Sequence, residues 1–491
     1  MVTTGDVRSH ASKESCWVII NGKAYDVTDF IDHHPGGANT ILRHAGKDAT
    51  AEYEPVHPEG TLDKHLPKDK HLGPVEPNDG GETDQPVSTS SNGDGKSTAS
   101  KQNPLSVLQN LDDFEKEAKK VLPEKAWIYY SSATDTLSSH INNRTAFSKV
   151  SLRPRVLRNV ARVSLQRDIM GFRSSLPIFI APAALAKLGH PDGELCLTRA
   201  AARYNIPHCP STYSSIGHTN LAACLQAEQK AADNDRGSLF FQLYAPINKR
   251  DGALKLIAEA RRLKFSALVV TVDSAVIGKR EEDERYKARL DHDSGIVFQA
   301  SSSPDPDPNL DRPVPRGAHS STLEWDDLVW IREAWGSGPI VLKGIATVED
   351  VVEAAKRGVN GVYLSNHGGR QLDYAPSSLH TLLEIRLFHP ELFDKIEIYV
   401  DGGFRRGTDV IKALCLGAKA VGLGRPFMYS LTGYGTEGVC RAIEILSDEI
   451  QTSMRLMGVT DVDQLDMSYV NTALLELEMP RLHNLRLQGK L

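Results

Sequence analysis

Eight short β-rich runs recur between residues 177 and 424, each followed by a stretch typical of a helix, and this alternation constrains the fold more than any other feature. Runs such as ALVVTVD and PIVLKG are apolar nearly throughout, as expected of strands that are buried on both faces of a parallel sheet. Eight such units predict an α/β fold, a closed (β/α)8 TIM barrel. The expected strands are residues 177–183, 207–211, 238–244, 267–273, 339–344, 361–366, 397–402 and 419–424.

Polar side chains stand at the ends of six of these predicted strands. In a barrel of this kind the reacting groups lie where the strands end. Any one of the six could serve the structure alone, but their shared position predicts a functional site at this end of the barrel. The six residues are Tyr244, Asp273, Lys343, His367, Asp401 and Arg425.

The chain is too long for a barrel alone, because it has 491 residues and a single barrel uses about 250. Residues 73–104 contain no aromatic residue, leucine, isoleucine or methionine, and 17 of these 32 residues are Gly, Pro, Ser or Thr. Such a segment cannot offset its chain entropy by burial, so it predicts a flexible linker with a root-mean-square span of about 30 Å. We expect an N-terminal domain over residues 1–73, a linker over 74–104, and a barrel domain with a C-terminal tail over 105–491.

The composition is that of a globular protein, with 40% hydrophobic and 24% charged residues. The longest apolar stretch, residues 176–186, is shorter than the roughly 18 residues of a membrane helix, so no membrane span is expected. No nucleic-acid partner is expected either. Six cysteines are scattered without CxxC pairs or a CxxCH box, which favours reduced thiols and a cytoplasmic location, without zinc, disulfides or c-type haem.

Two histidines in the N-terminal domain have a spacing that suits a haem site. His34 opens the turn sequence HPGG, and His57 follows 23 residues later, after a helical stretch. Two neutral imidazoles could face each other across an iron porphyrin, which would leave no open iron position and suit the transfer of single electrons. The alternative is that both histidines lie in a polar surface loop.

The surrounding sequence resembles the cytochrome b5 family over nearly all of residues 5–73. The matching segments read CWVIINGKAYDVTDF, HHPGG and AGKDAT. The resemblance implies a small α+β domain that binds haem b, with His34 and His57 as the axial iron ligands. It gives no role to His33, His44 or His65.

Two sequences rich in glycine and arginine follow the seventh and eighth predicted strands, DGGFRRG at residues 401–407 and GLGR at 422–425. Glycine amides and arginines at this position suit a phosphate group. Turn formation alone would explain Gly402 and Gly403, but not the arginines beside them. Since no GxGxxG sequence follows a strand, a mononucleotide is favoured over a nicotinamide dinucleotide.

The sequence SNHGGR at residues 365–370 follows the sixth predicted strand and contains two candidate substrate-binding groups. His367 is a candidate general base, and Arg370 could hold a carboxylate through two hydrogen bonds. A core histidine satisfied by the backbone is the alternative interpretation of His367.

The barrel motifs together resemble the FMN-dependent L-2-hydroxy acid dehydrogenases and oxidases over residues 105–470. The motifs are YYSSATD, FQLY, TVD with GKRE, VLKG, SNHGGRQLD, DGGFRRGTD and GLGRPF. The resemblance implies that FMN binds at the strand ends. The residues expected to contact FMN are Ala181, Pro182, Ala183, Ser211, Gln242, Thr271, Lys343, Asp401, Gly402, Gly403, Arg405, Gly424 and Arg425.

The same resemblance assigns roles around the substrate. Lys343 would also offset the negative charge that develops on the reduced flavin. Whether the base takes the C2 proton or the hydroxyl proton stays open. The implied roles are Tyr129 and Arg370 at the substrate carboxylate, Tyr244 and Arg280 at its hydroxyl side, His367 as the base, and Asp273 as the group that orients His367.

With both domains in one chain, the whole sequence resembles the flavocytochromes b2, fungal L-lactate:cytochrome c oxidoreductases. The resemblance implies oxidation of an L-2-hydroxy acid, most directly L-lactate to pyruvate, with electrons passing from FMN to haem b and on to cytochrome c. It also implies a homotetramer. Members of this family carry a mitochondrial presequence that is not seen here, so the mitochondrial intermembrane space is the alternative to the cytoplasm.

Two positions depart from the lactate-specialised pattern. Pro182 and Tyr213 stand where those members carry small or aliphatic groups, and Tyr213 resembles the pocket aromatic of glycolate oxidases. An oxidase of glycolate or of a bulkier 2-hydroxy acid, with oxygen as acceptor, is therefore the alternative function. A haem carrier on a degenerate barrel is disfavoured, because the groups needed for catalysis are all present.

Charge is uneven along the chain. Residues 1–80 hold 13 Asp or Glu against 8 Lys or Arg, whereas the remainder holds 50 against 49. An acidic haem domain favours a basic acceptor such as cytochrome c.

The connection over residues 281–321 is long for a barrel and contains five prolines between Pro304 and Pro315. Connections of this length without an obvious element are uncommon. We expect a mobile lid or a protease-sensitive surface loop here.

Overall fold

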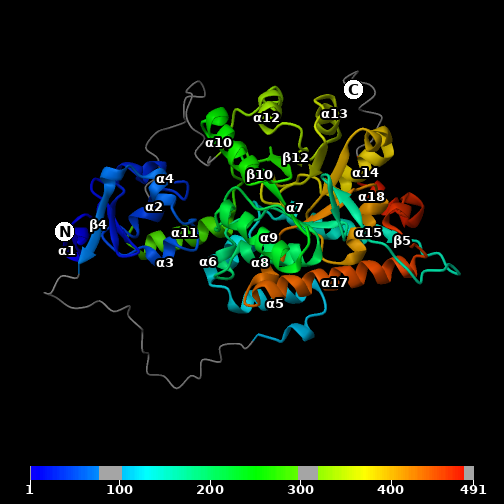
Figure 1. The fold of residues 1–491 in the computed structure, drawn as a ribbon, viewed down its shortest axis with the longest axis horizontal. Helices are drawn as coiled ribbons and strands as arrows, with labels where there is room; N and C mark the ends of the chain where they lie inside the picture. Colours follow the sequence, from blue (N-terminus) through cyan, green and yellow to red (C-terminus); the bar gives the residue numbers. More distant parts are fainter. Residues whose placement is uncertain (1, 77–101, 297–318, 480–491) are drawn as a thin grey trace. The chain divides into compact units, whose positions relative to one another are not determined.

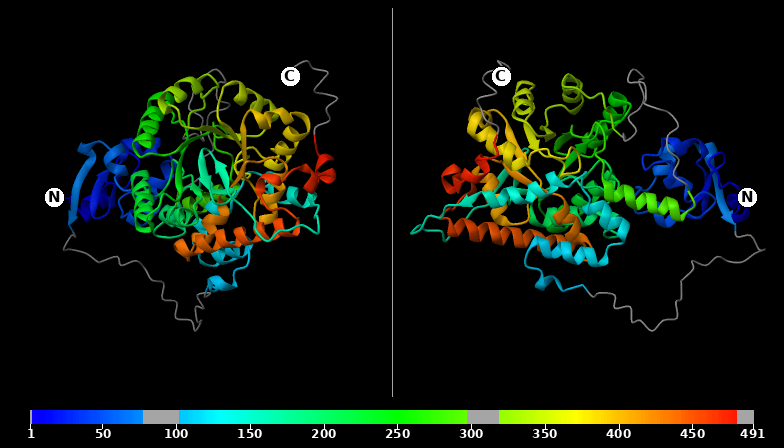
Figure 2. Two further views of the ribbon diagram at one scale, coloured as in Figure 1. Left: turned by 45° about the vertical axis from the view of Figure 1, so that its right-hand side comes forward. Right: turned by 180° about the vertical axis from the view of Figure 1, so that it is seen from behind.

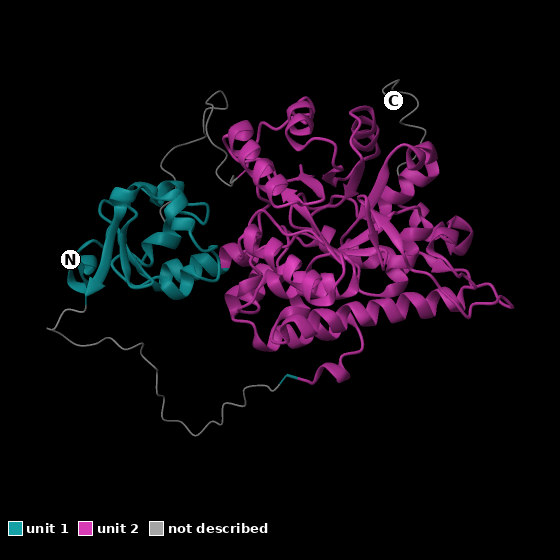
Figure 3. Ribbon diagram, in the orientation of Figure 1, with its two compact units in different colours: residues 1–102, 286–307 teal, residues 103–285, 308–491 magenta. Residues whose placement is uncertain are grey.

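The computed structural model describes residues 2–76, 102–296 and 319–479. The chain divides into two compact units, Met1–Gln102 with Tyr286–Asp307, and Asn103–Arg285 with Pro308–Leu491 (Figure 3). Among the described residues, no helix combines the length and the apolar composition that crossing a bilayer requires.

The smaller unit contains a four-stranded sheet in the order β1-β4-β3-β2. Strands β2 and β3 form an antiparallel hairpin whose turn residues, Asn21 and Gly22, both have positive φ (52° and 71°), as a two-residue turn of this kind requires. Strand β4 ends at Glu76, so this unit continues beyond the expected boundary at residue 73. The strands are β1 (Val2–Thr3), β2 (Trp17–Ile20), β3 (Lys23–Asp26) and β4 (His71–Glu76).

Short helices pack on both faces of this sheet, and together they form the α+β domain that the sequence predicts. Val7 of α1 is buried with Ile19 and Ala24, whereas the other helices pack on the opposite face. Val18 and Ile20 of β2 and Tyr25 of β3 are buried with Ile31, and Leu62 packs against them. The helices are α1 (Thr4–Ser9), η1 (Thr28–His33), α2 (Ala38–Leu42), α3 (Thr50–Tyr53) and α4 (Thr61–His65).

The larger unit is built on a closed barrel of eight parallel strands, which confirms the predicted fold (Figure 1). Each expected run overlaps one strand, and the strands pair in chain order before β15 closes on β8. The barrel strands are β8 (Ile178–Ile180), β9 (Pro207–His208), β10 (Ser238–Leu243), β11 (Ala267–Thr271), β12 (Ile340–Ile345), β13 (Gly361–Leu364), β14 (Glu397–Val400) and β15 (Ala420–Leu423).

Side chains fill the inside of the barrel, which is therefore a packed core rather than a channel. Phe179, Phe240, Tyr363 and Tyr399 are fully buried in one interior cluster. The hairpin of β6 (Arg167–Ile169) and β7 (Phe172–Ser174) contacts this cluster, and the Met170 N–H donates a hydrogen bond to the Tyr399 hydroxyl at 2.8 Å.

Helices surround the barrel, and α10, α12, α13 and α14 are seen outside the strands in two orientations (Figures 1 and 2). The long helix α17 packs against α8, α15 and α16. The short strands β5 (Ser151–Leu152) and β16 (Val470–Asn471) pair outside the barrel. The helices are α5 (Leu111–Val121), α6 (Glu124–Ser131), α7 (Ser138–Thr145), α8 (Glu194–Tyr204), α9 (His218–Ala232), α10 (Lys249–Arg262), α12 (Asp327–Trp335), α13 (Val348–Lys356), α14 (Ser378–Phe388), α15 (Gly407–Cys415), α16 (Arg425–Leu431), α17 (Gly435–Leu456) and α18 (Ala473–Glu476).

The expected loop over residues 281–321 begins with a helix, α11 (Glu281–Asp293). Its first turn holds four acidic residues, which stabilise a helix N-terminus, and Glu281 pairs with Arg285 one turn later. The prolines between Pro304 and Pro315 lie outside the described residues.

Candidate functional site

The backbone after β13 takes a conformation that glycine favours. His367, Gly368 and Gly369 have φ of 58°, 65° and 78°. A side chain on Gly369 would place its Cβ 2.6 Å from the backbone nitrogen of His140, so this approach requires glycine. His367 is not glycine, and a left-handed conformation of this kind persists where the surrounding structure holds it.

His367 lies between a carboxylate and a phenol. Its Nδ1 is 3.0 Å from both carboxylate oxygens of Asp273, which follows β11, and its Nε2 is 3.3 Å from the hydroxyl of Tyr244, which follows β10. Burial raises the pKa of Asp273, but the charges of His367 and Lys343, with hydrogen bonds from His367 and Ser274, bring it down to about 2. Asp273 is therefore ionised at neutral pH and keeps a proton on Nδ1 of His367, which leaves Nε2 as the basic atom.

Two residues hold Asp273 in place. The side-chain amide of Gln371 donates to the Asp273 carbonyl at 2.5 Å and to the Val276 carbonyl at 3.0 Å. Gly344 has a φ of 104°, and a Cβ there would lie 2.5 Å from the Asp273 Cβ. Sequence reasoning did not identify Gln371, although it lies within the SNHGGRQLD motif.

Arg370 presents half of its guanidinium without a protein acceptor. Its Nη1 donates to the carbonyls of Tyr129 and Ser132 at 2.7 and 3.2 Å, whereas Nε and Nη2 have no hydrogen-bond partner among the described residues. No described carboxylate forms an ion pair with it either. Burial and the nearby charges of Arg280 and Arg425 lower its pKa, as expected for a cation without an anionic partner.

Tyr129 of α6 lies between two of these cations, since Arg370 and Arg280 are 5.2 and 5.8 Å from its ring centroid. Arg280 stands just before α11, and its nearest described carboxylate is Asp283 at 3.7 Å. The structure thus brings together all six residues that the sequence analysis placed around the substrate.

Donors and acceptors suited to a flavin line the neighbouring strand ends. Lys343 of β12 is buried, with its Nζ 3.2 Å from the Ser365 hydroxyl and 3.8 Å from Asp401. Gln242 of β10 donates to the Thr271 hydroxyl at 2.9 Å. The second carboxylate oxygen of Asp401 is buried without a partner, and such an orphaned acceptor fits a bound hydroxyl group.

The predicted phosphate region contains both open space and paired charge. Apart from its chain neighbours, no described residue lies within 4 Å of a Cβ built on Gly424, whereas Gly402 and Gly403 have positive φ and pack against Asn143. The Arg425 guanidinium donates hydrogen bonds to three backbone carbonyls. The sequence analysis expected Arg405 to contact FMN. In this structure its guanidinium pairs instead with two carboxylates of α5, Asp112 at 3.2 Å and Glu115 at 2.8 Å.

The remaining residues expected at the flavin also follow barrel strands. Ala181, Pro182 and Ala183 follow β8, and the Ala181 N–H donates to the Leu423 carbonyl at 3.0 Å. Ser211 follows β9 and is buried. These groups and those above fit a mononucleotide at the strand ends.

His34 and His57 face each other in the smaller unit. Their ring centroids are 6.0 Å apart, so the two imidazoles are not stacked on each other. The rings of Tyr53 and His57, by contrast, are stacked with centroids 4.1 Å apart. Nδ1 of His34 lies 3.3 Å from the Gly37 carbonyl, and Nδ1 of His57 lies 3.0 Å from the Tyr53 carbonyl. Both imidazoles therefore keep Nε2 available as a metal ligand.

The surroundings of these two histidines fit a haem. Burial lowers the pKa of both rings, which keeps them in the neutral form that binds iron. A Cβ on Gly36 would lie 2.7 Å from the His34 ring, so the HPGG turn needs glycine for packing. Phe30 packs against the apolar core of this unit and lies edge-on to the His34 ring, with ring centroids 6.0 Å apart.

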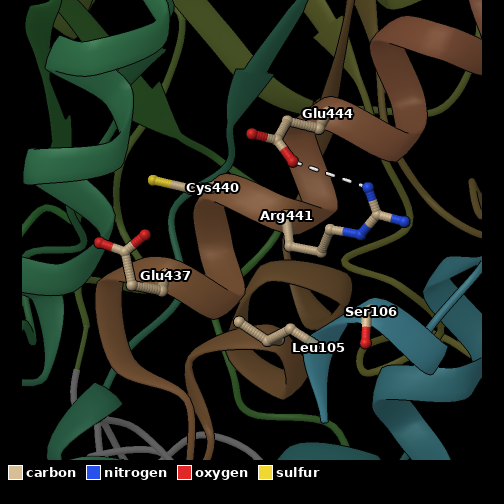
Figure 4. A pocket seen from close by; sticks show the side chains of 6 residues that line it. All are labelled: Leu105, Ser106, Glu437, Cys440, Arg441 and Glu444. Atoms are coloured by element: carbon tan, nitrogen blue, oxygen red, sulfur yellow. Dashed lines mark ion pairs between the residues drawn. The ribbon is translucent and has the colours of Figure 1, made fainter.

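A surface hollow of about 370 Å³ lies elsewhere, on α17 (Figure 4). It shares no residue with the strand ends. Arg441 and Glu444 within it form an ion pair at 3.6 Å, and burial raises the pKa of the Cys440 thiol to about 11. An unreactive thiol and a satisfied ion pair do not form a catalytic group. The lining residues are Leu105, Ser106, Glu437, Cys440, Arg441 and Glu444.

The larger unit carries the candidate base His367 at the end of its barrel, and the smaller unit carries the paired histidines His34 and His57. Together they define an oxidoreductase with two cofactors. The FMN-dependent dehydrogenase model matches residues 118–472, and the cytochrome b5-like heme/steroid binding domain model matches residues 3–76. The chain belongs to the FMN-dependent dehydrogenase family, and it carries a cytochrome b5-like domain at its N-terminal side. It binds FMN in the first of these domains and haem in the second.

Several known proteins are similar to most of the chain. The L-lactate dehydrogenase (cytochrome) of Wickerhamomyces anomalus is 39% identical over 95% of this chain and 79% of that protein. A solved mutant of flavocytochrome b2 with pyruvate bound matches with a TM-score of 0.68 and 35% identity, over 77% of this chain and 90% of that chain. A peroxisomal (S)-2-hydroxyacid oxidase of Arabidopsis thaliana is 35% identical over 78% of this chain and 100% of that protein.

Proposed function

We propose that the protein oxidises L-lactate to pyruvate and passes the electrons through haem b to a cytochrome c. Arg370 carries this proposal, because its guanidinium has an unpaired edge, lies over the Tyr129 ring and follows His367 by three residues after β13. A 2-hydroxy acid has a carboxylate that Arg370 could bind and a hydroxyl that could lie against His367 and Tyr244. The similarity to an L-lactate dehydrogenase (cytochrome) supports lactate as substrate and a cytochrome as acceptor, and the acidity of residues 1–80 favours a basic cytochrome c.

Arg370 would hold the substrate carboxylate through Nε and Nη2, a two-pronged arrangement that fixes orientation as well as affinity. Tyr129 would contact the same carboxylate, while Arg280 and Tyr244 would lie on the hydroxyl side. This orientation would place the substrate C2 atom within reach of His367. Positioning of this kind lowers the activation barrier of the reaction.

His367 would take one proton from the substrate at Nε2. The ionised Asp273 stabilises the resulting imidazolium, because the opposite charge lies 3.0 Å away. FMN, when bound, accepts the two electrons that the substrate loses. The geometry is compatible with removal of either the C2 proton or the hydroxyl proton.

The proposed FMN contacts follow from the strand-end positions. Lys343 would offset negative charge on the flavin, and Asp401 would accept from a ribose hydroxyl. Arg405 would have to exchange a carboxylate partner for phosphate. The other proposed contacts are Ala181, Pro182, Ala183, Ser211, Gln242, Thr271, Gly402, Gly403, Gly424 and Arg425, and the proposed iron ligands are His34 and His57.

A second function, oxidation of glycolate or a bulkier acid by oxygen, is favoured by Tyr213. This aromatic side chain lies with its ring centroid 5.7 Å from that of Tyr244, and an Arabidopsis (S)-2-hydroxyacid oxidase is among the similar proteins. We also propose a homotetramer and a cytoplasmic location, with the mitochondrial intermembrane space as the alternative. All six cysteines are free, which suits a reducing compartment.

An anaerobic stopped-flow experiment with L-lactate tests the proposal. Flavin bleaching should come first, and the haem bands should follow within the same reaction. D-lactate serves as the matched control and should leave both spectra unchanged. Flavin reduction without haem reduction, together with rapid oxygen consumption in air, would favour the oxidase instead.

A further inference from the structure

Tyr363 of β13 is fully buried, and its hydroxyl has no hydrogen-bond partner among the described residues. The side chain belongs to the cluster that fills the inside of the barrel, where its ring lies edge-on to Phe179 with centroids 5.3 Å apart. Burying a hydroxyl without a hydrogen bond costs free energy. Such a group in a packed core calls for a partner that the chain itself does not supply.

The Tyr363 hydroxyl lies toward the end of the barrel that carries the candidate flavin site. Tyr363 is in register with Lys343 of β12, and the Lys343 Nζ is 5.3 Å from the Tyr363 ring centroid. A Cβ on Gly422 would overlap the Tyr363 hydroxyl, so the phenol reaches β15 and requires glycine there. Gly422 stands two residues before Gly424, in the predicted phosphate region.

A second buried atom without a partner belongs to Asp401, which follows β14 beside β13. Oδ1 of Asp401 has no hydrogen bond among the described residues, whereas Oδ2 is 3.8 Å from the Lys343 Nζ. Burial raises the pKa of Tyr363 well above its usual value, and the nearby charge of Asp401 raises it further. The phenol therefore keeps its proton at neutral pH and can donate a hydrogen bond.

These two polar groups are complementary to an alcohol. A hydroxyl group both donates and accepts, so it can satisfy a carboxylate oxygen, which only accepts, and a phenol, which donates. FMN carries hydroxyl groups on the ribityl chain that joins its ring system to its phosphate. Since the proposed contacts place Lys343 at the ring system and Gly424 at the phosphate, the ribityl chain would lie between them.

We propose that the Tyr363 hydroxyl is a further FMN-binding group. It donates to one hydroxyl of the ribityl chain, and that hydroxyl donates to Oδ1 of Asp401. The inference rests on the contact between Asp401 and FMN in the proposed function, and it adds the donor that a carboxylate cannot provide.

The test measures the Kd of FMN for the flavin-free, haem-containing full-length protein, from the quenching of FMN fluorescence. Tyr363→Phe should weaken FMN about 2- to 10-fold, the net value of one hydrogen bond. Riboflavin, which keeps the ribityl chain but lacks the phosphate, should show the same loss. Lumiflavin, which has the ring system without either group, should bind the variant and the wild type equally.

Tyr399→Phe is the matched control. Tyr399 is buried in the same cluster, but its hydroxyl already donates to Glu397 and accepts from the Met170 N–H. This variant should bind FMN as the wild type does. An unchanged FMN Kd in Tyr363→Phe, or an equal loss for lumiflavin, would overturn the inference.

Thermal unfolding of the flavin-free protein tests the alternative partner, a buried water. Tyr363→Phe should unfold at the wild-type temperature or above, because it removes a hydroxyl that has no partner until FMN binds. A lower temperature together with unchanged FMN affinity would assign the hydroxyl to the fold alone and overturn the inference.

Asp401→Asn tests the proposed function separately. Unchanged FMN affinity in this variant, with a loss in Tyr363→Phe, would contradict the proposed Asp401 contact and support the role of Tyr363. All these affinities are measured without substrate, so they do not depend on whether the protein oxidises L-lactate.

Discussion

His367 is the residue whose replacement is most informative, because its side chain links Asp273 and Tyr244 from a strained backbone position. We predict that His367→Gln keeps both cofactors but reduces the flavin about 10²- to 10⁴-fold more slowly. Glutamine can hydrogen-bond to Asp273 but cannot accept a proton. Anaerobic bleaching of the flavin by L-lactate measures the rate. His389→Gln is the control, and wild-type rates in both variants would remove His367 from the reaction.

Arg370 tests how the substrate anion is held. Arg370→Lys should weaken the binding of L-lactate and pyruvate by about 10- to 100-fold, because an ammonium cannot replace two parallel charge-assisted hydrogen bonds. Titration of the flavin spectrum with pyruvate gives the Kd. Arg173→Lys, at an exposed hairpin position, should bind as the wild type does. Unchanged pyruvate affinity in Arg370→Lys would mean that the carboxylate binds elsewhere.

At the scale of elements, the end of β12 is shaped by one glycine. Gly344→Ala should lower the free energy of unfolding by about 1–3 kcal/mol, because φ is 104° and a Cβ would meet Asp273. The same displacement of Asp273 should slow flavin reduction. Urea unfolding and stopped-flow spectra measure the two effects.

Gly358→Ala is the matched control for this prediction. Gly358 also has positive φ (69°), but in the described part of the chain no atom beyond its neighbours lies within 4 Å of a Cβ there. This variant should lose some stability and keep the wild-type rate of flavin reduction. Equal rates in the two variants would show that Asp273 is not displaced.

The eight barrel strands could be predicted because burial on both faces makes them continuous apolar runs. Helix α11 could not, since its charged sequence has little apolar periodicity and it lies in a segment rich in proline further on. The second half of strand β4 falls in the expected linker, because the sequence after residue 73 begins with proline and contains no aromatic residue. Its pairing with β1 and β3 is a tertiary contact that no local pattern records.

Part of the candidate site could also be predicted from the sequence. Residues at strand ends are brought together by the barrel itself, so Tyr244, Asp273 and His367 could be grouped from their positions. His319 stacks on Tyr244 from the long connection before α12, with ring centroids 4.1 Å apart, and nothing in the surrounding sequence marks it. The pairing of Arg405 with Glu115 joins residues 290 positions apart, which is beyond the reach of motif reasoning.

At the scale of the whole molecule, we predict that the covalent connection between the two units sets how often the haem meets the flavin. Cleavage within residues 77–101 should leave flavin reduction by L-lactate unchanged but slow haem reduction, because a high effective concentration is lost. Haem reduction should then depend on protein concentration, which dilution in the stopped-flow instrument can show. Equal haem reduction by separated halves at micromolar concentration would contradict this.

The acidic haem domain should make transfer to cytochrome c depend on salt. The rate should fall as ionic strength rises from about 0.01 to 0.15 M, where the Debye length shrinks from about 30 to about 8 Å. Flavin reduction by L-lactate involves buried groups and should change much less.

Asp63 and Glu59 are the first residues to neutralise, since both are exposed close in sequence to His57. Asp63→Asn with Glu59→Gln should slow cytochrome c reduction at low salt. Asp168→Asn, on the barrel hairpin, is the control and should have no effect. A rate independent of salt and of these replacements would point to another acceptor.

The proposed role of Arg370 would also limit turnover. The carboxylate that it would hold is the same before and after the reaction, so this residue cannot distinguish the substrate from the 2-oxo acid. Product should therefore compete for the site, and net flux should fall as the 2-oxo acid accumulates. Rapid removal of the 2-oxo acid by a following reaction would keep the protein working at its full rate.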